Sequence, residues 1–263
     1  MNRAERLTLL LELMASDGRI DVEDVMARFG VSAATARRDL DTLAEQQLLT
    51  RTRGGAIAHS VAYSLPVRYM NLRHSQQKAR IAQAASAMVP VGASIGLCGG
   101  TTSTAIAAAL LARADLMEPG TELNLTVVTN AINIAMQFAL RPQIKTVMTG
   151  GVVQPGSYGL VGSYSAAVLD AIALDFAFIG CGGLDAAHGP TCHDEREAMV
   201  NAQLARRASQ VVLVADSSKL GTRVFASLGD SSLFPVVITD AGATPEQIAP
   251  LEAVGYQVRI AAE

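Results

Sequence analysis

Residues 22–41 read VEDVMARFGVSAATARRDLD and contain two amphipathic segments separated by a tight Gly-Val-Ser connection. In residues 22–29 the apolar side chains recur at helical spacing, and Asp21 and Gly30 are placed to cap the start and the end of this helix. Ser32 is placed to cap a second helix, whose apolar stripe continues through Leu40. Two short helices joined in this way predict a helix-turn-helix.

The flanking residues extend this motif into a winged helix-turn-helix. Residues 3–17 carry leucines and a methionine on one helical face, which predicts a preceding helix. Residues 50–56, TRTRGGA, alternate polar side chains and end in a glycine pair, as a β-hairpin wing does. We therefore predict a DNA-binding domain over residues 1–57.

The polar side chains of this domain predict its contacts with DNA. The second helix of a helix-turn-helix enters the major groove with its N-terminal residues toward the base edges. Small residues there, Ala36 included, allow close approach, and arginines reach phosphates or guanine edges. The predicted DNA-contacting residues are Ser32, Ala33, Thr35, Arg37 and Arg38 on the helix, with Arg51 and Arg53 on the wing.

The alternative is that these arginines form the solvated face of an ordinary helical bundle. Residues 1–57 carry 8 arginines against 9 acidic residues, so the domain as a whole is not basic. The placement of charge favours DNA binding, because residues 28–53 hold five arginines and three acids, whereas six of the nine acids precede them.

The composition is that of a globular chain long enough for two domains. It has 263 residues, of which 50% are hydrophobic and 17% charged, with a net charge of −3. Tryptophan is absent and aromatic residues make up 4%, which argues against a base-stacking platform or a large aromatic hot spot.

The same sequence predicts a reduced, cytoplasmic protein with no metal, no cofactor and no membrane segment. Its cysteines, at positions 98, 181 and 192, are odd in number and form no CxxC pair. His188 and His193 flank Cys192 but lack the spacing of a zinc site. The uncharged residues 81–112 are interrupted by proline and glycines that would break a membrane-spanning helix, and the N-terminus carries charges unlike a secretory signal.

Beyond residues 58–77, which show no clear period and are predicted to form a linker, the pattern changes. Short apolar runs rich in β-formers alternate with amphipathic helices over residues 78–263, which predicts a mainly parallel α/β sheet covered on both faces. The predicted strands include residues 94–97, 125–129, 146–149, 176–179, 211–215, 236–239 and 258–260.

The ends of these strands predict an anion site. Residues 98–103, CGGTTS, follow a strand and open a helix, so they offer backbone N–H groups, hydroxyls and a positive helix end to a phosphate. The turn lacks the lysine of a P-loop and the pattern GxGxxG, so an ordinary α/β turn is the alternative. Asn130, Gly150-Gly151 and residues 180–185 also follow strands, where open α/β sheets bind ligands.

Two charged residues are candidates for the same site. Lys219 is one of three lysines in the chain and follows a strand end, where it can supply a cation for a phosphate; an exposed loop lysine is the alternative. Glu197 belongs to an acidic run that opens a helix, where carboxylates ordinarily stabilise the helix N-terminus.

Residues 3–57 resemble the N-terminal domain of the DeoR family of bacterial sugar-metabolism repressors, in helix spacing, in the FGVS turn, in TxRRDLxxL and in the wing ending RGGA. The chain departs from the family at Ala36, where a β-branched residue is usual, and at Gln47, at or near which a glycine is usual. These departures imply a different base preference and a different turn from helix to wing.

Residues 78–260 resemble the sensor domain of the same family. The shared stretches are KxxIAxxA at 78, GGTT at 99, VTN at 128, TGG at 149, DFAFIG at 175, EAMVN at 197, ADSSK at 215 and ITD at 238. The resemblance implies a fold similar to ribose-5-phosphate isomerase and the acyl-CoA transferases, with a phosphorylated sugar as effector. The implied pocket comprises Gly99, Gly100, Thr101, Thr102, Asn130, Gly151, Asp185, Glu197 and Lys219, to which the turn itself adds Ser103.

Together these features predict a transcriptional repressor and not an enzyme. It would bind operator double-stranded DNA as a homodimer or homotetramer and be released by a phosphorylated sugar or polyol. The alternative is a sugar-phosphate isomerase-like enzyme that uses Glu197 as a general base and its N-terminal helices for assembly.

Overall fold

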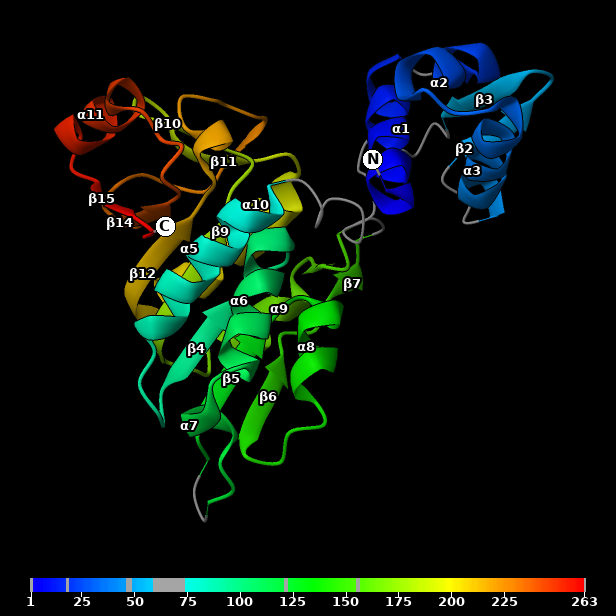
Figure 1. Cartoon of the computed structure of the whole chain (residues 1–263). Helices are drawn as coiled ribbons and strands as arrows, with labels where there is room; N and C mark the ends of the chain where they lie inside the picture. Colours follow the sequence, from blue (N-terminus) through cyan, green and yellow to red (C-terminus); the bar gives the residue numbers. More distant parts are fainter. Residues whose placement is uncertain are drawn as a thin grey trace. The chain divides into compact units, whose positions relative to one another are not determined.

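The computed structural model describes residues 2–17, 19–45, 49–58, 74–120, 123–154 and 157–262. The chain divides into two compact units, residues 1–73 and residues 74–263, and each unit is described by itself (Figure 1). Most of the predicted linker, residues 59–73, lies outside the described residues, so the domain limits 57 and 78 stay predictions.

The first unit packs three helices against a small antiparallel sheet. Its core is formed by leucines of the first and third helices together with Val25 of the second. The predicted winged helix-turn-helix is confirmed. In chain order the elements are α1 (Arg3–Asp17), β1 (Arg19–Asp21), α2 (Val22–Phe29), α3 (Ala33–Glu45), β2 (Leu49–Thr52) and β3 (Gly55–Ala58), with strand order β1-β3-β2.

The predicted helix caps are present. Gly30 ends α2 in the left-handed conformation, with φ of 63°, and its N–H donates to the carbonyl of Met26 at 3.0 Å. Asp21 precedes α2, and its N–H donates to the carboxylate of Asp24 at 3.4 Å. Ser32 Oγ accepts the N–H of Thr35 at 3.3 Å, which holds the first turn of α3.

The structure explains why glycine occupies both central positions of the wing motif RGGA. Gly54 turns the hairpin with φ of 100°, a conformation that side chains rarely adopt. Gly55 pairs with Asp21, and a Cβ on Gly55 would overlap the carbonyl of Ile20. The sequence pattern did not predict β1, because three residues show no period and only pairing with β3 makes them a strand.

The second unit is built on a seven-stranded sheet in the order β15-β14-β12-β9-β4-β5-β6, with every neighbouring pair parallel. The prediction of a parallel α/β sheet is confirmed. Its strands are β4 (Ser94–Leu97), β5 (Leu125–Thr129), β6 (Ile144–Met148), β9 (Leu174–Gly180), β12 (Ala208–Val214), β14 (Val236–Thr239) and β15 (Gln257–Ile260).

Helices cover both faces of this sheet. In β9, Phe176 and Phe178 face one hydrophobic cluster, whereas Ala177 and Ile179 face the other, as alternation along a strand requires. Figure 1 shows α5, α6 and α8 lying over one face of the sheet. The helices are α5 (Ser75–Ala87), α6 (Thr101–Leu111), α7 (Ala114–Met117), α8 (Ile132–Phe138), α9 (Tyr164–Leu169), α10 (Glu195–Arg206) and α11 (Pro245–Ala253).

Two small antiparallel sheets add to this framework, and neither was predicted. The first has the order β10-β11-β13 and consists of β10 (Gly183–Asp185), β11 (Gly189–Cys192) and β13 (Ala226–Ser227). The second is a hairpin of β7 (Val152–Val153) and β8 (Leu160–Val161). Strands of two to four residues are too short to show the alternation from which a strand is predicted.

Candidate DNA-reading surface and effector pocket

Helix α3 exposes the arginines that the sequence singled out. Ser32, Arg37 and Arg38 are exposed, and Ala33 and Thr35 are half-buried. Among the residues that the structure describes, neither Arg37 nor Arg38 has a hydrogen bond or an ion pair from its side chain. Both guanidinium groups are therefore available to an anionic partner.

The next residue of the RRDL motif has a different role. Asp39 is buried, and its Oδ2 accepts a hydrogen bond from Arg6 Nε of α1 at 2.6 Å, while Arg3 Nε lies 3.7 Å from its Oδ1. This ion pair ties α3 to α1 from the inner side. The ion pair of Asp39 with Arg6 holds one face of α3 inward, and the face that carries Arg37 and Arg38 is therefore the one exposed to solvent.

The expected role of Ala36 in approaching the bases is wrong. Ala36 is fully buried and packs in the core of the first unit with Leu40 and Leu43. A β-branched residue at this position would therefore change core packing rather than a contact with a base. Gln47, the other departure from the family pattern, lies outside the described residues.

The two arginines of the wing differ. Arg51 Nε donates to Asp41 Oδ1 at 2.7 Å, and its NH1 group donates to the carbonyl of Gly55, so this side chain braces the wing against α3. Arg53 is exposed beside the hairpin turn, and nothing in the described part of the chain pairs with its guanidinium. Only Arg53 therefore keeps its full hydrogen-bonding capacity for DNA. The prediction that both contact DNA stays untested.

In the second unit, the turn after β4 is held by the residue after β5. Asn130 is buried, and its Oδ1 accepts the N–H of Gly99 at 3.0 Å. Thr102 and Ser103 are buried in the first turn of α6, and Gly100 precedes them with φ of 131°. No described group forms a hydrogen bond with Thr102 Oγ1. The turn thus combines free N-terminal amides with an unsatisfied buried hydroxyl.

The β7–β8 hairpin is joined to the same place. Leu160 N–H donates to the Asn130 carbonyl at 2.6 Å, and Asn130 Nδ2 donates to the Leu160 carbonyl at 3.3 Å. Gly151 must be glycine, because its φ is 134° and a Cβ would lie 2.8 Å from the Val161 carbonyl oxygen. A Cβ on Gly159 would lie 3.7 Å from Glu197 Oε1. Glu197 therefore lies against the hairpin that Asn130 holds.

Lys219 is anchored close to these strand ends. It lies in the short 3₁₀ turn Ser217–Lys219 after β12, and its Nζ donates to the Cys181 carbonyl at 2.7 Å. Asp240, which follows β14, fixes this turn by accepting the N–H and the hydroxyl of Ser217 at 2.7 and 3.0 Å.

Asp216 and Lys78 are buried near this turn and were not predicted as site residues. Burial acts to raise the pKa of Asp216. The Ser218 hydroxyl and the charges of Lys219, His74 and Lys78 nevertheless hold that pKa below its usual range. Lys78 of α5 is itself buried, so it brings a second lysine within electrostatic reach of Asp216. The scarcity of lysine in the chain was the signal that could have identified Lys78.

The pKa values of the cysteines show which charged side chains lie near the turn of residues 99–103. All three are free and buried. Burial raises the pKa of the Cys98 thiol; Glu197 raises it further, whereas Lys219 lowers it, so both side chains lie within electrostatic reach of the turn. Burial raises the pKa of Cys181 to about 11. These thiols are therefore protonated at neutral pH and are poor nucleophiles.

Asp185, another predicted pocket residue, is bound mainly by residues close to it in the sequence. Its Oδ1 lies 2.7 Å from His188 Nδ1 and accepts the N–H groups of Ala187 and His188, so it holds the β10–β11 turn. The hydrogen bond from His188 lowers the pKa of this carboxyl. The neighbouring Leu184 bridges to Leu220, which places β10 beside the turn that carries Lys219. A role for Asp185 in binding a ligand stays a prediction.

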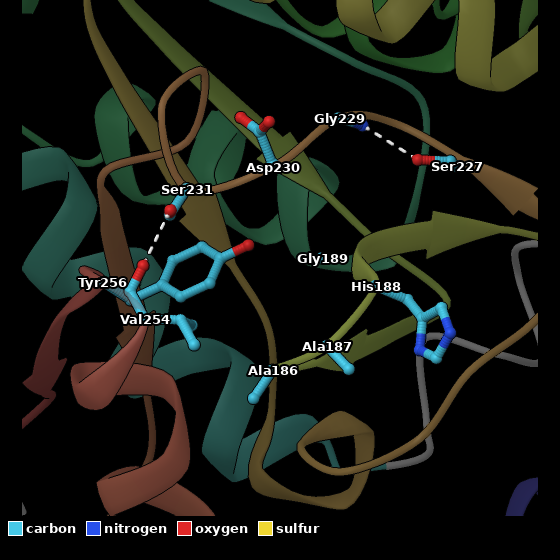
Figure 2. Close-up of a pocket in the computed structure, with 10 residues that line it drawn as sticks. All are labelled: Ala186, Ala187, His188, Gly189, Ser227, Gly229, Asp230, Ser231, Val254 and Tyr256. Atoms are coloured by element: carbon cyan, nitrogen blue, oxygen red, sulfur yellow. Dashed lines mark hydrogen bonds between the residues drawn. The ribbon is translucent and has the colours of Figure 1, made fainter.

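A separate cavity of about 440 Å³ is lined in part by the β10–β11 turn (Figure 2). It is lined by residues 186–189, by Ser227 of β13 and by residues of the loops that precede β14 and β15. Its described lining includes Asp230 and Tyr256 but no lysine or arginine. Burial is the chief cause that raises the pKa of the Tyr256 phenol to about 12. This cavity is therefore unsuited to a phosphate.

The described residues contain no group of three or more histidine, cysteine or acidic side chains arranged to hold a metal ion. None of the described helices has the length and apolar character needed to cross a bilayer.

Comparison with known proteins places both units. Residues 6–61 match the model of the DeoR-like helix-turn-helix domain, and residues 73–241 match that of the DeoR C-terminal sensor domain. The glycerol-3-phosphate regulon repressor of Escherichia coli K12 is 30% identical over 92% of this chain and 92% of its own length. The transcriptional repressor GlcR of Bacillus subtilis 168 is 32% identical over 91% of this chain and 89% of its own length.

Among solved structures, ribose 5-phosphate isomerase A from Methanocaldococcus jannaschii is 22% identical, with a TM-score of 0.38 over 56% of this chain and 54% of that one. A likeness this weak carries no conclusion about a shared site or activity. The two family models and the full-length relatives confirm the resemblance seen in the sequence, and the chain belongs to the DeoR family.

Proposed function

We propose that this protein is a repressor of a carbohydrate operon that binds operator DNA through α3 and the wing. The proposal rests on Arg37 and Arg38, whose exposed side chains have no partner among the described residues, and on the adjacent Asp39, which holds α3 against α1. A helix that is held in place on its buried face and carries guanidinium groups on its exposed face suits insertion into a major groove. The relatives named as repressors support the same function.

We further propose that a phosphorylated sugar or polyol binds at the turn of residues 99–103 and releases the DNA. Free amides at the start of α6, the buried hydroxyl of Thr102 and the nearby charge of Lys219 are groups that favour a phosphate. The names of relatives, which include a glycerol-3-phosphate regulon repressor and a putative aga operon repressor, support an effector of this class.

We propose that the second unit senses its ligand without converting it. Glu197, Asp185 and Lys219 are residue types that an isomerase could use, but Asp185 is engaged by its own turn and the full-length relatives are repressors. Incubation of the protein with each bound sugar phosphate, followed by NMR of the ligand, should show no isomerised product. Turnover abolished by Glu197→Gln would instead support the enzyme.

A thermal-shift screen over phosphorylated sugars and polyols, with the unphosphorylated compounds as controls, tests the sensor. A ligand present at about 100 Kd should stabilise the second unit by roughly 2.7 kcal/mol. DNA duplexes selected from a random pool by the protein then serve in a binding titration with and without that ligand. A protein that selects no sequence, or whose selected duplex is unaffected by every stabilising ligand, would contradict the repressor mechanism.

A further inference from the structure

Glu197 is a half-buried acid whose carboxylate has no hydrogen bond or ion pair with any residue that the structure describes. The start of α10 is capped without it, because the Asp194 carboxylate accepts the N–H groups of Arg196 and Glu197 at 2.9 and 3.1 Å. The guanidinium of the adjacent Arg196 is bound to Asp194 Oδ2 at 2.7 Å. The Glu197 carboxylate therefore keeps its capacity to accept hydrogen bonds from a ligand.

This carboxylate lies beside the proposed phosphate turn. A Cβ built on Gly99 would lie 3.8 Å from the Cα of Gly159. A Cβ built on Gly159 would in turn lie 3.7 Å from Glu197 Oε1 and 4.0 Å from Asn130 Nδ2. Gly159 is therefore packed between the turn and the carboxylate, and it has no side chain to separate them.

The face of α10 that carries Glu197 also reaches the residue that holds the turn. Asn201 lies four residues after Glu197, so the two side chains share one face of the helix. Asn201 is buried, and its Oδ1 lies 3.5 Å from Asn130 Nδ2. The Asn130 side chain accepts the Gly99 N–H at 3.0 Å. These contacts fix α10 relative to the turn, so a ligand that binds at the turn lies close to Glu197.

A carboxylate without a partner opposes the binding of an anion. Glu197 raises the pKa of the buried Cys98 thiol and Lys219 lowers it, so one acidic and one basic side chain lie within electrostatic reach of the turn. A phosphate monoester carries about −1.5 to −2 charges at pH 7 and is repelled by Glu197. Hydroxyl groups on the same ligand offset this repulsion by donating hydrogen bonds to the carboxylate, whereas a second acidic group increases it.

We propose that Glu197 determines the class of effector, because it accepts hydrogen bonds from the hydroxyl groups of a phosphorylated polyol or sugar and excludes phosphorylated acids. The inference rests on the proposed function, since it assumes that the phosphate binds at residues 99–103. It adds that the remainder of the effector is uncharged and presents a hydroxyl to the carboxylate. Glu197 is then a specificity-determining residue of a sensor, and this role needs no chemical step.

Two pairs of compounds test this selection, because the members of each pair differ only in a terminal CH2OH group or carboxylate. They are glycerol 3-phosphate with 3-phosphoglycerate, and glucitol 6-phosphate with 6-phosphogluconate. Calorimetric titration into the full-length protein without DNA measures each Kd. In at least one pair the alcohol should bind about a hundredfold more tightly than the acid, because the acid exchanges a charge-assisted hydrogen bond for a repulsion.

Glu197→Gln keeps the size of the side chain and removes its charge, so it tests the residue itself. It should reduce the preference for the alcohol by about tenfold or more, whereas a merely structural role would weaken both compounds in proportion. Glu195→Gln removes the same charge from an exposed position on the same helix and should leave the preference unchanged.

The outcomes separate this inference from the proposed function. Equal affinity for alcohol and acid in the unchanged protein, or a preference that Glu197→Gln does not alter, would overturn the role of Glu197 while the phosphate site remains supported. An equal change in Glu195→Gln would likewise overturn it, since the effect would then come from net charge alone. Failure of all four compounds to bind would contradict the phosphate site and the inference together.

Discussion

The first turns of α3 and α6 are both rich in small and hydroxyl residues, yet they differ in burial and in unused hydrogen-bonding capacity. At α3, Ser32 is exposed and its hydroxyl is engaged by Thr35, whose N–H it accepts and whose Oγ1 lies 3.0 Å away. At α6, Thr102 is 3% exposed and its hydroxyl has no partner among the described residues.

This difference suits the two turns to different anions. A satisfied, exposed turn followed by arginines that have no partner in the described part of the chain can lie against a long polyanion, which supplies many weak contacts. An unsatisfied, buried turn gains most from a small anion that fills its hydrogen-bonding capacity. The same residue types therefore serve different ligands because of what surrounds them.

Removal of the group that orients α3 should have the largest effect. Asp39→Ala leaves the Arg6 guanidinium, which is 11% exposed in its side chain, without its partner, so the first unit should lose about 3–5 kcal/mol of stability. Chemical denaturation of the unchanged and variant proteins measures this loss. Arg3→Ala, whose side chain is 56% exposed, is the control and should cost much less; equal losses would show that Asp39 is not the anchor.

A carboxylate placed in each first turn should separate the two sites. Thr101→Asp puts a negative charge where the phosphate would lie and should weaken effector binding by about a hundredfold or more, since two charge-assisted hydrogen bonds account for that much. Ala34→Asp on the exposed face of α3 should weaken DNA binding instead. Calorimetry and DNA titration of both variants test the pair. Normal effector response in Thr101→Asp would reduce the 99–103 turn to a structural feature.

The phosphate itself should account for most of the effector affinity. The unphosphorylated form of the effector should bind about a hundredfold more weakly, for the same loss of charge-assisted hydrogen bonds. Calorimetric titration of both compounds into the unchanged protein measures the ratio. Equal affinity would contradict an anion site at α6 while leaving the DNA-binding surface of α3 unaffected.

Arg38→Ala should weaken operator binding by about 1–3 kcal/mol and leave the stability of the first unit unchanged, because the side chain is exposed and unpaired among the described residues. A titration at fixed salt, repeated with Arg80→Ala in α5 as a control outside the first unit, measures the effect. Unchanged affinity would remove Arg38 from the DNA-reading surface.

The smallest expected effect concerns the wing. Arg53→Ala should reduce the salt dependence of DNA binding by about one unit of slope, as the loss of one phosphate contact does. Arg51→Ala should chiefly destabilise the wing, because Arg51 is bound to Asp41 and Gly55. Titrations over a salt series, with denaturation of both variants, distinguish the roles. A slope that changes only in Arg51→Ala would reverse this assignment.

Several elements were predictable because their signals are local. The bounds of β4, β5 and β14 agree with the predicted strands, since each is a short apolar run between polar residues. Gly30 ends α2 as predicted, because only the left-handed conformation of a glycine stops the helix there. By contrast, the start of α6 at Thr101 was not predicted, because hydroxyl residues in a first turn resemble a loop in sequence.

The sequence by itself determined the helix-turn-helix of the first unit, the parallel α/β class of the second unit and the family, all of which depend on spacing along the chain. Only the tertiary structure decided which polar groups are occupied. Arg51 and Arg53 look alike in sequence, but only Arg51 is bound to Asp41 and Gly55. In the same way, nothing in the sequence distinguishes Asp39 as the partner of Arg6. Likewise Asn130 holds Gly99 from 31 residues away. Such partners meet only when the chain folds, because burial and hydrogen bonding act across space and not along the sequence.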